Sequence, residues 1–222
     1  MIINLNLQNR KVCIVGGGAE ATKRIIPLLQ ENCKILVISD KINKKILNLA
    51  AKKKIQIKKR KLKDGEFLQK EKPFLVITTT NNFELNSKIL QKANELKIIS
   101  YSSDNSDQSD FANPATINFE KIIKIAIFTG GKSPIMSKKI KEQVENSLKK
   151  IIKKEDIEQI KIQEIARKLV KKRIDNYKKR KEFLNNLTRD KKIKQLIKDR
   201  QKKKIENRIY ELMRKENESK DN

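Results

Sequence analysis

The chain has 222 residues and a net charge of +27, from 54 lysine and arginine residues against 27 aspartate and glutamate residues, and it contains no histidine. The missing histidine excludes His-ligated metal sites, imidazole bases and Ser–His triads. The charge favours a polyanionic partner, namely nucleic acid, anionic lipid or a small molecule with many carboxylates.

Two further absences concern the compartment. No apolar run reaches the roughly 18 residues of a membrane span, and the N-terminus has no basic leader before an apolar core. The two cysteines, Cys13 and Cys33, form neither a metal motif nor a disulfide framework. We therefore expect a cytoplasmic protein with no membrane partner and no protein-bound metal, in which both cysteines are core or near-core residues.

A strand that runs directly into glycines is the most informative motif. Residues 11–15 are predicted to form a buried strand, and helical character extends over about 19–31. Gly16, Gly18 and Ala21 have the G-x-G-x-x-G/A spacing of dinucleotide-binding folds. In that motif the first glycine permits the turn, the second lets the backbone approach a pyrophosphate, and the small third residue lets helix and strand pack closely.

The first residues of the helix, Ala19 and Glu20, complete the predicted phosphate site. A helix N-terminus offers unpaired N–H groups and a partial positive charge to an anion. The Glu20 carboxylate is unfavourable beside a pyrophosphate unless it points away. The alternative interpretation is a tight strand–helix turn without a ligand.

An acidic residue lies at the expected distance beyond the glycines. Asp40 follows the predicted strand 34–39, and a carboxylate about 20 residues past the glycines accepts hydrogen bonds from the adenosine ribose. The same carboxylate would repel a 2′-phosphate, so we expect NAD rather than NADP, although Lys41 could tolerate a phosphate. The alternative is that Asp40 caps the following helix.

The alternation of strands and helices predicts a parallel, doubly wound sheet with ligands at the carboxyl ends of its strands. Thr80 and Asp104 should meet the glycines and Asp40 at that edge. The further strands are expected at 55–60 (an edge strand), 74–80 (buried on both faces) and 98–102, and the further helices at about 44–53 and 83–95.

A different pattern begins near residue 110. Alternating apolar residues predict a β-hairpin at 116–119 and 121–128, followed by a turn-rich linker in which Ser133 suits a helix N-cap. Apolar residues at helical spacing continue from about Ile135 to about Arg214, and we expect fraying from Asn217 onward.

Several motifs in order give the chain a family resemblance. The series begins with V-C-I-V-G-G-G, continues through T-T-T-N-N with Asn86 and through Asp104, and ends with F-A-N-P-A and I-F-T-G-G-K-S-P. It resembles the sirohaem synthase family, whose members are precorrin-2 dehydrogenases, some doubling as sirohydrochlorin ferrochelatases. The most specific parts are T-G-G-K-S-P after a hairpin and D-F-A-N-P-A upstream of it.

The resemblance implies NAD-dependent oxidation of precorrin-2 to sirohydrochlorin, with metal insertion left open. It further implies a homodimer and a polycarboxylate tetrapyrrole as substrate. The implied division is a Rossmann NAD-binding domain at 1–112, a dimerisation region at 113–150 and a helical C-terminal domain at 151–222.

The resemblance also assigns site residues. Asp104 matches the essential aspartate and would act as general base, with a turn residue as the alternative. Ser133, Lys132 and Asn113 are the implied substrate contacts, although Ser133 also suits an N-cap and Lys132 a solvated surface.

The sequence departs from the family pattern at three places. Tyr101 replaces the more usual asparagine three residues before the aspartate, and Glu20 and Thr22 replace the more usual valine and arginine. Two other functions remain open: a regulatory NAD-binding module, which would need neither Asp104 nor T-G-G-K-S-P, and a nucleic-acid-binding protein. The latter is disfavoured by an aromatic content of 5% and the absence of tryptophan.

Overall fold

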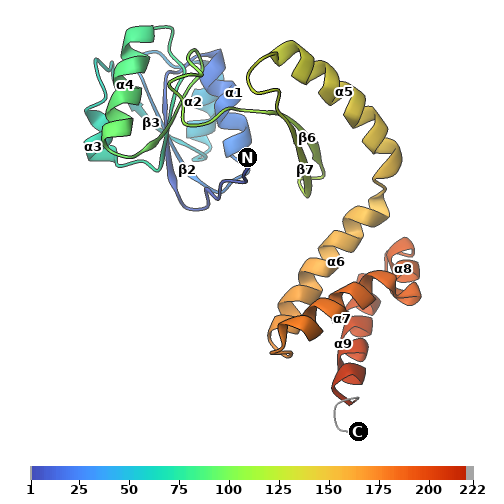
Figure 1. Ribbon diagram of the computed structural model, residues 1–222. Coiled ribbons are helices and arrows are strands. Elements are labelled where there is room, and N and C mark those ends of the chain that lie inside the picture. The colour runs from blue at the N-terminus through green and yellow to red at the C-terminus, as the bar shows by residue number, and fades with distance from the viewer. Residues whose placement is uncertain (1, 219–222) are drawn as a thin grey trace. The chain divides into compact units, whose positions relative to one another are not determined.

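The computed structural model describes residues 2–218, and the chain divides into two compact units, Met1–Asn113 and Pro114–Asn222 (Figure 1). The first unit is an α/β sandwich and the second combines a β-hairpin with helices. The separate status of a dimerisation region at 113–150 stays a prediction.

The first unit contains the predicted parallel sheet, with strand order β3-β2-β1-β4-β5. Its strands are β1 (Lys11–Val15), β2 (Lys34–Ser39), β3 (Gln56–Lys59), β4 (Leu75–Thr78) and β5 (Ile99–Ser102). As expected, β3 lies at the edge and β4 is buried along its whole length. The doubly wound fold is confirmed.

The first three strands are added toward one edge of the sheet and the last two toward the other edge, so β1 pairs with β2 on one side and with β4 on the other. Val15 is in register with Ile38 and with Thr78, and Thr78 is in register with Ser102. The carboxyl ends of four strands therefore share one edge, with a topological switch point between β1 and β4.

Alternate residues of β1, β2 and β4 bury into two separate cores. On β1, Val12 and Ile14 enter one core, while Cys13 and Val15 enter the other. Helices α1 (Ala19–Leu28) and α2 (Lys44–Ala51) contribute to the first core, and α3 (Phe67–Glu71) and α4 (Phe83–Glu95) to the second (Figure 1). Full burial of each such aliphatic side chain contributes about 1.5–3 kcal/mol.

Two element bounds differ from expectation. Helix α1 ends at Leu28, three residues before the predicted end, and its last turn contains Pro27, which has no N–H to donate. The five-residue helix α3 was not predicted, because so short a segment carries too little periodicity to be recognised.

The second unit begins with the predicted hairpin, formed by β6 (Ala115–Phe119) and β7 (Ile123–Ile127). Glu120 and Lys121 have φ values of 48° and 63°. Ile122 N donates to Phe119 O at 2.9 Å and closes the turn. Two successive positive φ values produce a turn whose twist matches that of the flanking strands. Helix α5 (Pro134–Ile151) follows and contacts both strands.

The remaining helices enclose a core of their own. They are α6 (Lys154–Lys171), α7 (Tyr177–Arg189), α8 (Lys191–Lys198) and α9 (Lys202–Glu218). Phe183, Leu187, Ile193 and Ile209 are among the most buried side chains of this core. Helix α9 continues through Glu218, past Asn217 where we expected fraying to begin, and residues 219–222 lie outside the described part. Within residues 2–218 no helix combines the length and apolarity needed to cross a membrane.

Candidate functional site

The three glycines after β1 meet different surroundings. Gly16 has a φ of +114°, and a Cβ atom there would lie 2.5 Å from Thr79 Oγ1. A Cβ on Gly17 would lie 2.2 Å from the carbonyl oxygen of Lys41, whereas a Cβ on Gly18 would meet nothing within 4 Å. The fold itself therefore requires Gly16 and Gly17, while Gly18 leaves open space in which a pyrophosphate could approach the protein backbone.

The start of α1 is anchored through the carbonyl of Gly18. This oxygen accepts hydrogen bonds from Thr22 N at 3.2 Å, Thr22 Oγ1 at 3.1 Å and Asn43 Nδ2 at 2.9 Å. Thr22 is buried, so this departure from the family pattern has a structural role. Gly18 is the N-cap residue and supplies no side-chain cap. The first N–H groups of a helix lack intrahelical partners and favour an anion.

The carboxylate of Glu20 is engaged along the helix. It pairs with Arg24 at 2.7 Å and with Lys23 at 3.1 Å. Burial would raise the pKa of Glu20, but the Lys23 hydrogen bond and the Arg24 charge outweigh it and lower the pKa. Its negative charge is thus compensated by two cations of α1, and its backbone N–H remains part of the helix start.

Asp40 follows β2 as predicted and does not cap the next helix. Its exposed carboxylate accepts a hydrogen bond from Lys41 N at 2.9 Å. Asn43 caps α2 instead, because its Oδ1 accepts from Ile46 N at 3.0 Å. Asn43 also donates to Gly18 O, so it joins the β2–α2 loop to the glycine turn. This role of Asn43 was not predicted from the sequence.

A hydrogen-bond network holds Asp104 at both carboxylate oxygens. Asn86 Nδ2 donates to Asp104 Oδ2 at 2.8 Å, and Ser102 Oγ donates to Asp104 Oδ1. Asn86 also donates to Thr80 O at 2.9 Å and accepts from Thr80 Oγ1 at 2.6 Å. Ser102 Oγ lies 2.7 Å from Thr78 Oγ1. Asn86 and Ser102 are each 2% exposed, so both act as fixed donors beneath an exposed carboxylate.

This arrangement argues against Asp104 as a simple turn residue. Asn105 makes the turn contacts of this loop, because its Oδ1 accepts from Asp107 N at 3.1 Å and Gln108 N at 3.2 Å. The structure also joins the aspartate to the predicted cofactor residue Thr80 through the single side chain of Asn86.

Tyr101, the departure three residues before the aspartate, is a core residue. It is 9% exposed and stacks on Phe111 with ring centroids 5.1 Å apart, and the Arg24 guanidinium lies 5.0 Å from its ring centre. The ring fills space beside α1, and the polar contacts of the site come from Asn86 and Ser102.

The predicted substrate residues fall on both units. Asn113, exposed, ends the first unit, whereas Lys132 and Ser133 belong to the second. Ser133 caps α5 by accepting from Met136 N at 3.2 Å. Thr129 organises the loop, since its Oγ1 lies 2.9 Å from Ser137 Oγ. The capping role of Ser133 is observed, and substrate contact by these residues stays a prediction.

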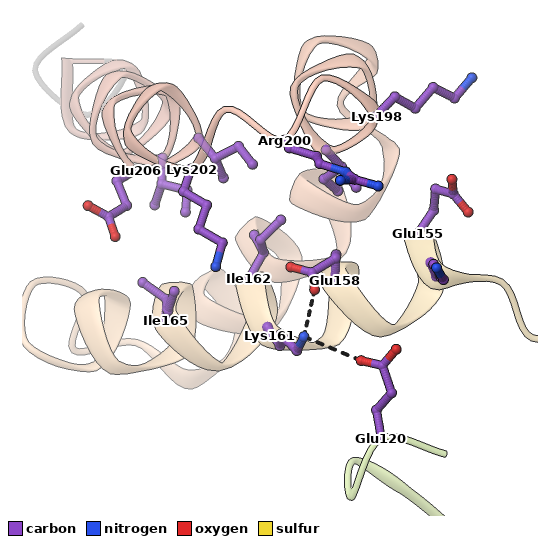
Figure 2. Close-up of a pocket in the computed structure, with 14 residues that line it drawn as sticks. Glu120, Glu155, Glu158, Lys161, Ile162, Ile165, Lys198, Arg200, Lys202 and Glu206 are labelled. Carbon is purple, nitrogen blue, oxygen red and sulfur yellow. Dashed lines mark hydrogen bonds and ion pairs between the residues drawn. The ribbon is translucent and has the colours of Figure 1, made fainter.

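The helices of the second unit also line a cavity of about 510 Å³ (Figure 2). At its edge, Lys161 on α6 pairs with Glu158 at 2.6 Å and with Glu120 of the hairpin turn at 3.7 Å. Ile162 and Ile165 contribute apolar surface. Across the described residues, no group of three or more Cys, Asp or Glu side chains could hold a metal ion.

Comparison with known proteins gives consistent matches. Residues 3–115 match the sequence profile of the family described as "Putative NAD(P)-binding". The chain is 30% identical over 145 residues to precorrin-2 dehydrogenase of Priestia megaterium, which covers 65% of this chain and 69% of that protein. It is 26% identical over 148 residues to precorrin-2 dehydrogenase of Bacillus subtilis (strain 168), covering 64% of this chain and 85% of that protein.

A solved structure, "SirC, precorrin-2 dehydrogenase", is similar over nearly the whole chain. The TM-score is 0.71 at 23% sequence identity, over 95% of this chain and 99% of the other. At this identity the likeness shows a shared fold, which includes the hairpin and the helices of the second unit.

Proposed function

Since the chain belongs to the sirohaem synthase family, within which it matches precorrin-2 dehydrogenases, we propose that it oxidises precorrin-2 to sirohydrochlorin with NAD as the electron acceptor. The family resemblance inferred from the motifs is confirmed. The observation that carries the proposal is the doubly anchored carboxylate of Asp104 at the strand edge that also holds the glycine turn.

The first unit has the features that a dinucleotide needs. Gly16 shapes the turn, Gly18 leaves room for a pyrophosphate, and Ala19 and Glu20 supply backbone N–H groups at the helix start. The exposed carboxylate of Asp40 would accept a hydrogen bond from a ribose hydroxyl, which favours NAD over NADP. When bound, NAD supplies the acceptor for the hydride that leaves the substrate.

The two remaining named cofactor contacts lie at neighbouring strand ends. Thr80 follows β4 beside the switch point, where ligands of doubly wound sheets bind. Lys41 is exposed next to Asp40 and carries a charge that a phosphate could use. We propose cofactor contacts for Thr80 and Lys41 because of where the two residues lie in the fold.

Asp104 is the general base of the proposed reaction. Oxidation of precorrin-2 removes a hydride and a proton, and the proton needs an acceptor that is held in place. Asn86 and Ser102 fix the two oxygens from below, while the carboxylate itself is exposed and can receive the proton. No other chemistry is required of the protein beyond orienting the macrocycle.

Three residues are the proposed substrate contacts. In the second unit Lys132 can pair with a substrate carboxylate and Ser133 can donate a hydrogen bond, and Asn113, the last residue of the first unit, offers an amide. The net charge of +27 would draw a polycarboxylate toward the protein from solution. We propose that the reaction takes place in the cytoplasm, a reducing compartment that suits the free thiols of Cys13 and Cys33.

The proposal includes a homodimer formed through the hairpin and α5. Ser137 is the single buried residue of α5, an 18-residue helix. Phe128, Ile135 and Met136 are 50%, 81% and 44% exposed in the chain by itself. A helix with so little of its apolar surface covered is typical of one that packs against a second subunit.

The test is a turnover assay with purified protein and precorrin-2, followed by absorbance with NAD and then with NADP. We expect oxidation with NAD, and Asp104→Ala should abolish it while NAD still binds. Near-normal turnover by that variant would refute the assignment of the base. Adding ferrous or cobaltous ion to the product tests metal insertion, and sedimentation analysis of Ile135→Asp tests the dimer.

A further inference from the structure

A wide groove in the second unit has an excess of positive charge. It is lined by residues of α6, α7 and the hairpin turn, and has a volume of about 1190 Å³. Pockets for drug-sized ligands usually have roughly 300–1,000 Å³, so this groove suits a larger molecule. Its basic lining residues are Lys121, Arg167, Lys171, Arg180 and Lys181, and its one acidic lining residue is Glu164.

The charge of the groove is not neutralised internally. Glu164 pairs with Lys168 at 2.6 Å, and Lys168 is not part of the lining. Among the side chains that the structure describes, which end at residue 214, the four groove cations on α6 and α7 form no ion pair with an acidic side chain, unlike Lys161 and Lys168 on α6. An uncompensated cluster in a concave surface concentrates anions from solution.

The cations are distributed over both walls, with apolar side chains between them. Arg167 and Lys171 belong to α6, whereas Arg180 and Lys181 belong to α7. The apolar lining residues are Ile122, Ile160, Val170, Leu184 and Tyr177. Tyr177 is 71% exposed and Ile160 is 42% exposed, so both present apolar surface that an entering ring system could cover.

One buried donor at the groove also lacks an acceptor. Gln163 Nε2 donates to Leu184 O at 3.0 Å and ties the two helices together. The neighbouring lining residue Gln159 has a buried Nε2 with no hydrogen-bond partner among the described residues. A buried unpaired amide is costly. Rotation of this amide would let a carboxylate in the groove supply the missing acceptor.

The cavity in Figure 2 does not share this charge excess. That cavity is also lined by α6, but its five cations face four carboxylates: Glu120, Glu155, Glu158 and Glu206. The two cavities therefore share a helix and differ in net charge, and the groove is the one that selects for an anion.

We propose that the α6–α7 groove is a second binding site for the acidic tetrapyrrole, formed by residues other than those proposed for the reaction. This inference rests on the proposed function. A porphyrinoid has a flat apolar body with carboxylates around its whole rim, which matches apolar surface between two cationic walls. Single-stranded nucleic acid carries its charge along one backbone and needs a continuous basic track, which fits two facing walls less well.

Matched variants of the full-length protein test the groove. Arg180→Gln with Lys181→Gln removes two groove cations, and Lys178→Gln with Lys179→Gln removes two exposed cations of the same helix that do not line the groove. The probe is uroporphyrin, a stable fluorescent tetrapyrrole with carboxylates around its rim, titrated by fluorescence quenching. We expect the groove pair to weaken binding about tenfold or more, and the control pair less than about twofold.

Two further measurements separate this inference from the function. Wild-type turnover of precorrin-2 with NAD decides the function alone. Equal uroporphyrin affinity in the two pairs would overturn the groove site even if turnover is normal, and selective loss in the groove pair would support it even if turnover is absent. The same pairs titrated with labelled single-stranded RNA give a third outcome. If the double variant Arg180→Gln with Lys181→Gln lost RNA affinity but kept uroporphyrin affinity, the groove would be a nucleic-acid site and the tetrapyrrole site would be overturned.

Discussion

Asn86 on α4 reaches Asp104 beyond β5 with a hydrogen bond of 2.8 Å, although 18 residues separate them in the chain. The same amide also bonds to the hydroxyl and the backbone carbonyl of Thr80, so one buried side chain connects the ends of β4 and β5. The proposed base and a proposed cofactor contact therefore share a common support, and a change at this support should affect catalysis without removing any group that touches substrate.

Asn86→Ala tests Asn86 as a positioning residue. The Asp104 carboxylate would lose one of its two side-chain donors, and misplacement of a catalytic group by about 1 Å can cost about 100-fold in rate. We expect kcat with precorrin-2 to fall about 10- to 100-fold, measured per NAD-binding site so that unfolded protein is not counted. Asn94→Ala, on the exposed side of the same helix, is the matched control and should keep full kcat. A kcat within twofold of wild type for Asn86→Ala would refute the positioning role.

Alanine substitutions at two neighbouring glycines of the turn should have opposite effects on the fold and on cofactor binding. Gly18→Ala adds a methyl group to open space at a φ of −90°, so the fold should be kept while the pyrophosphate is obstructed. Gly17→Ala places a methyl group 2.2 Å from the Lys41 carbonyl, so it should destabilise the fold by about 1–3 kcal/mol. Melting curves without cofactor and NAD titrations separate the two effects. A Gly18→Ala protein that binds NAD like wild type would show that the open space is not the phosphate site.

The strands and the glycine turn were predictable because they depend on local pattern. The apolar run before Gly16 and the spacing to Gly18 already encode a buried strand, a turn and a helix start. The cap of α2 was not predictable in the same way. Asp40 and Asn43 both suit an N-cap, and the choice depends on how the loop packs on the glycine turn, through the bond from Asn43 to Gly18 O.

The support of Asp104 is likewise a tertiary feature. Asn86 lay within a quoted motif, but its role requires the neighbouring positions of β4, β5 and α4, which no local spacing contains. In the second unit, lysines between the apolar positions hide the helix boundaries. The caps Asn176 and Asp190, which accept from Lys179 N and Ile193 N, were the available signals for the starts of α7 and α8.

Asp40→Asn tests cofactor choice. The amide can still bond to a ribose hydroxyl but no longer repels a 2′-phosphate, so NAD affinity should fall by about tenfold and NADP affinity should change less or rise. Titration with each cofactor measures the ratio. Asp64→Asn removes the same charge from an exposed loop of the same unit and should leave the ratio unchanged. Equal losses for NAD and NADP in Asp40→Asn would remove the ribose assignment.

The carboxylate of Glu71 makes stability depend on pH. Glu71, at the end of α3, pairs with Lys58 on β3 at 2.5 Å and with Lys11 on β1 at 3.5 Å, and its side chain is 10% exposed. The hydrogen bond from Lys58 lowers the pKa of Glu71, aided by the charges of Lys58 and Lys11 and opposed by burial. The folded-state pKa thus lies below the ordinary value of 4.5. The stabilisation is complete above that value and is lost as the pH falls through the folded-state pKa.

Glu71→Gln should therefore unfold more easily than wild type at pH 7, by about 1 kcal/mol, which is roughly 2–4 °C in Tm for a chain of this size. The difference should shrink below about pH 4.5 because the wild-type carboxyl then becomes neutral as well. Thermal melts between pH 7 and pH 3 measure it. Glu84→Gln, whose carboxylate is exposed and pairs with Lys88 on the same helix, should change Tm little at any pH. A Glu71→Gln difference that stays constant down to pH 3 would show that lost packing, and not the charge of Glu71, causes the destabilisation.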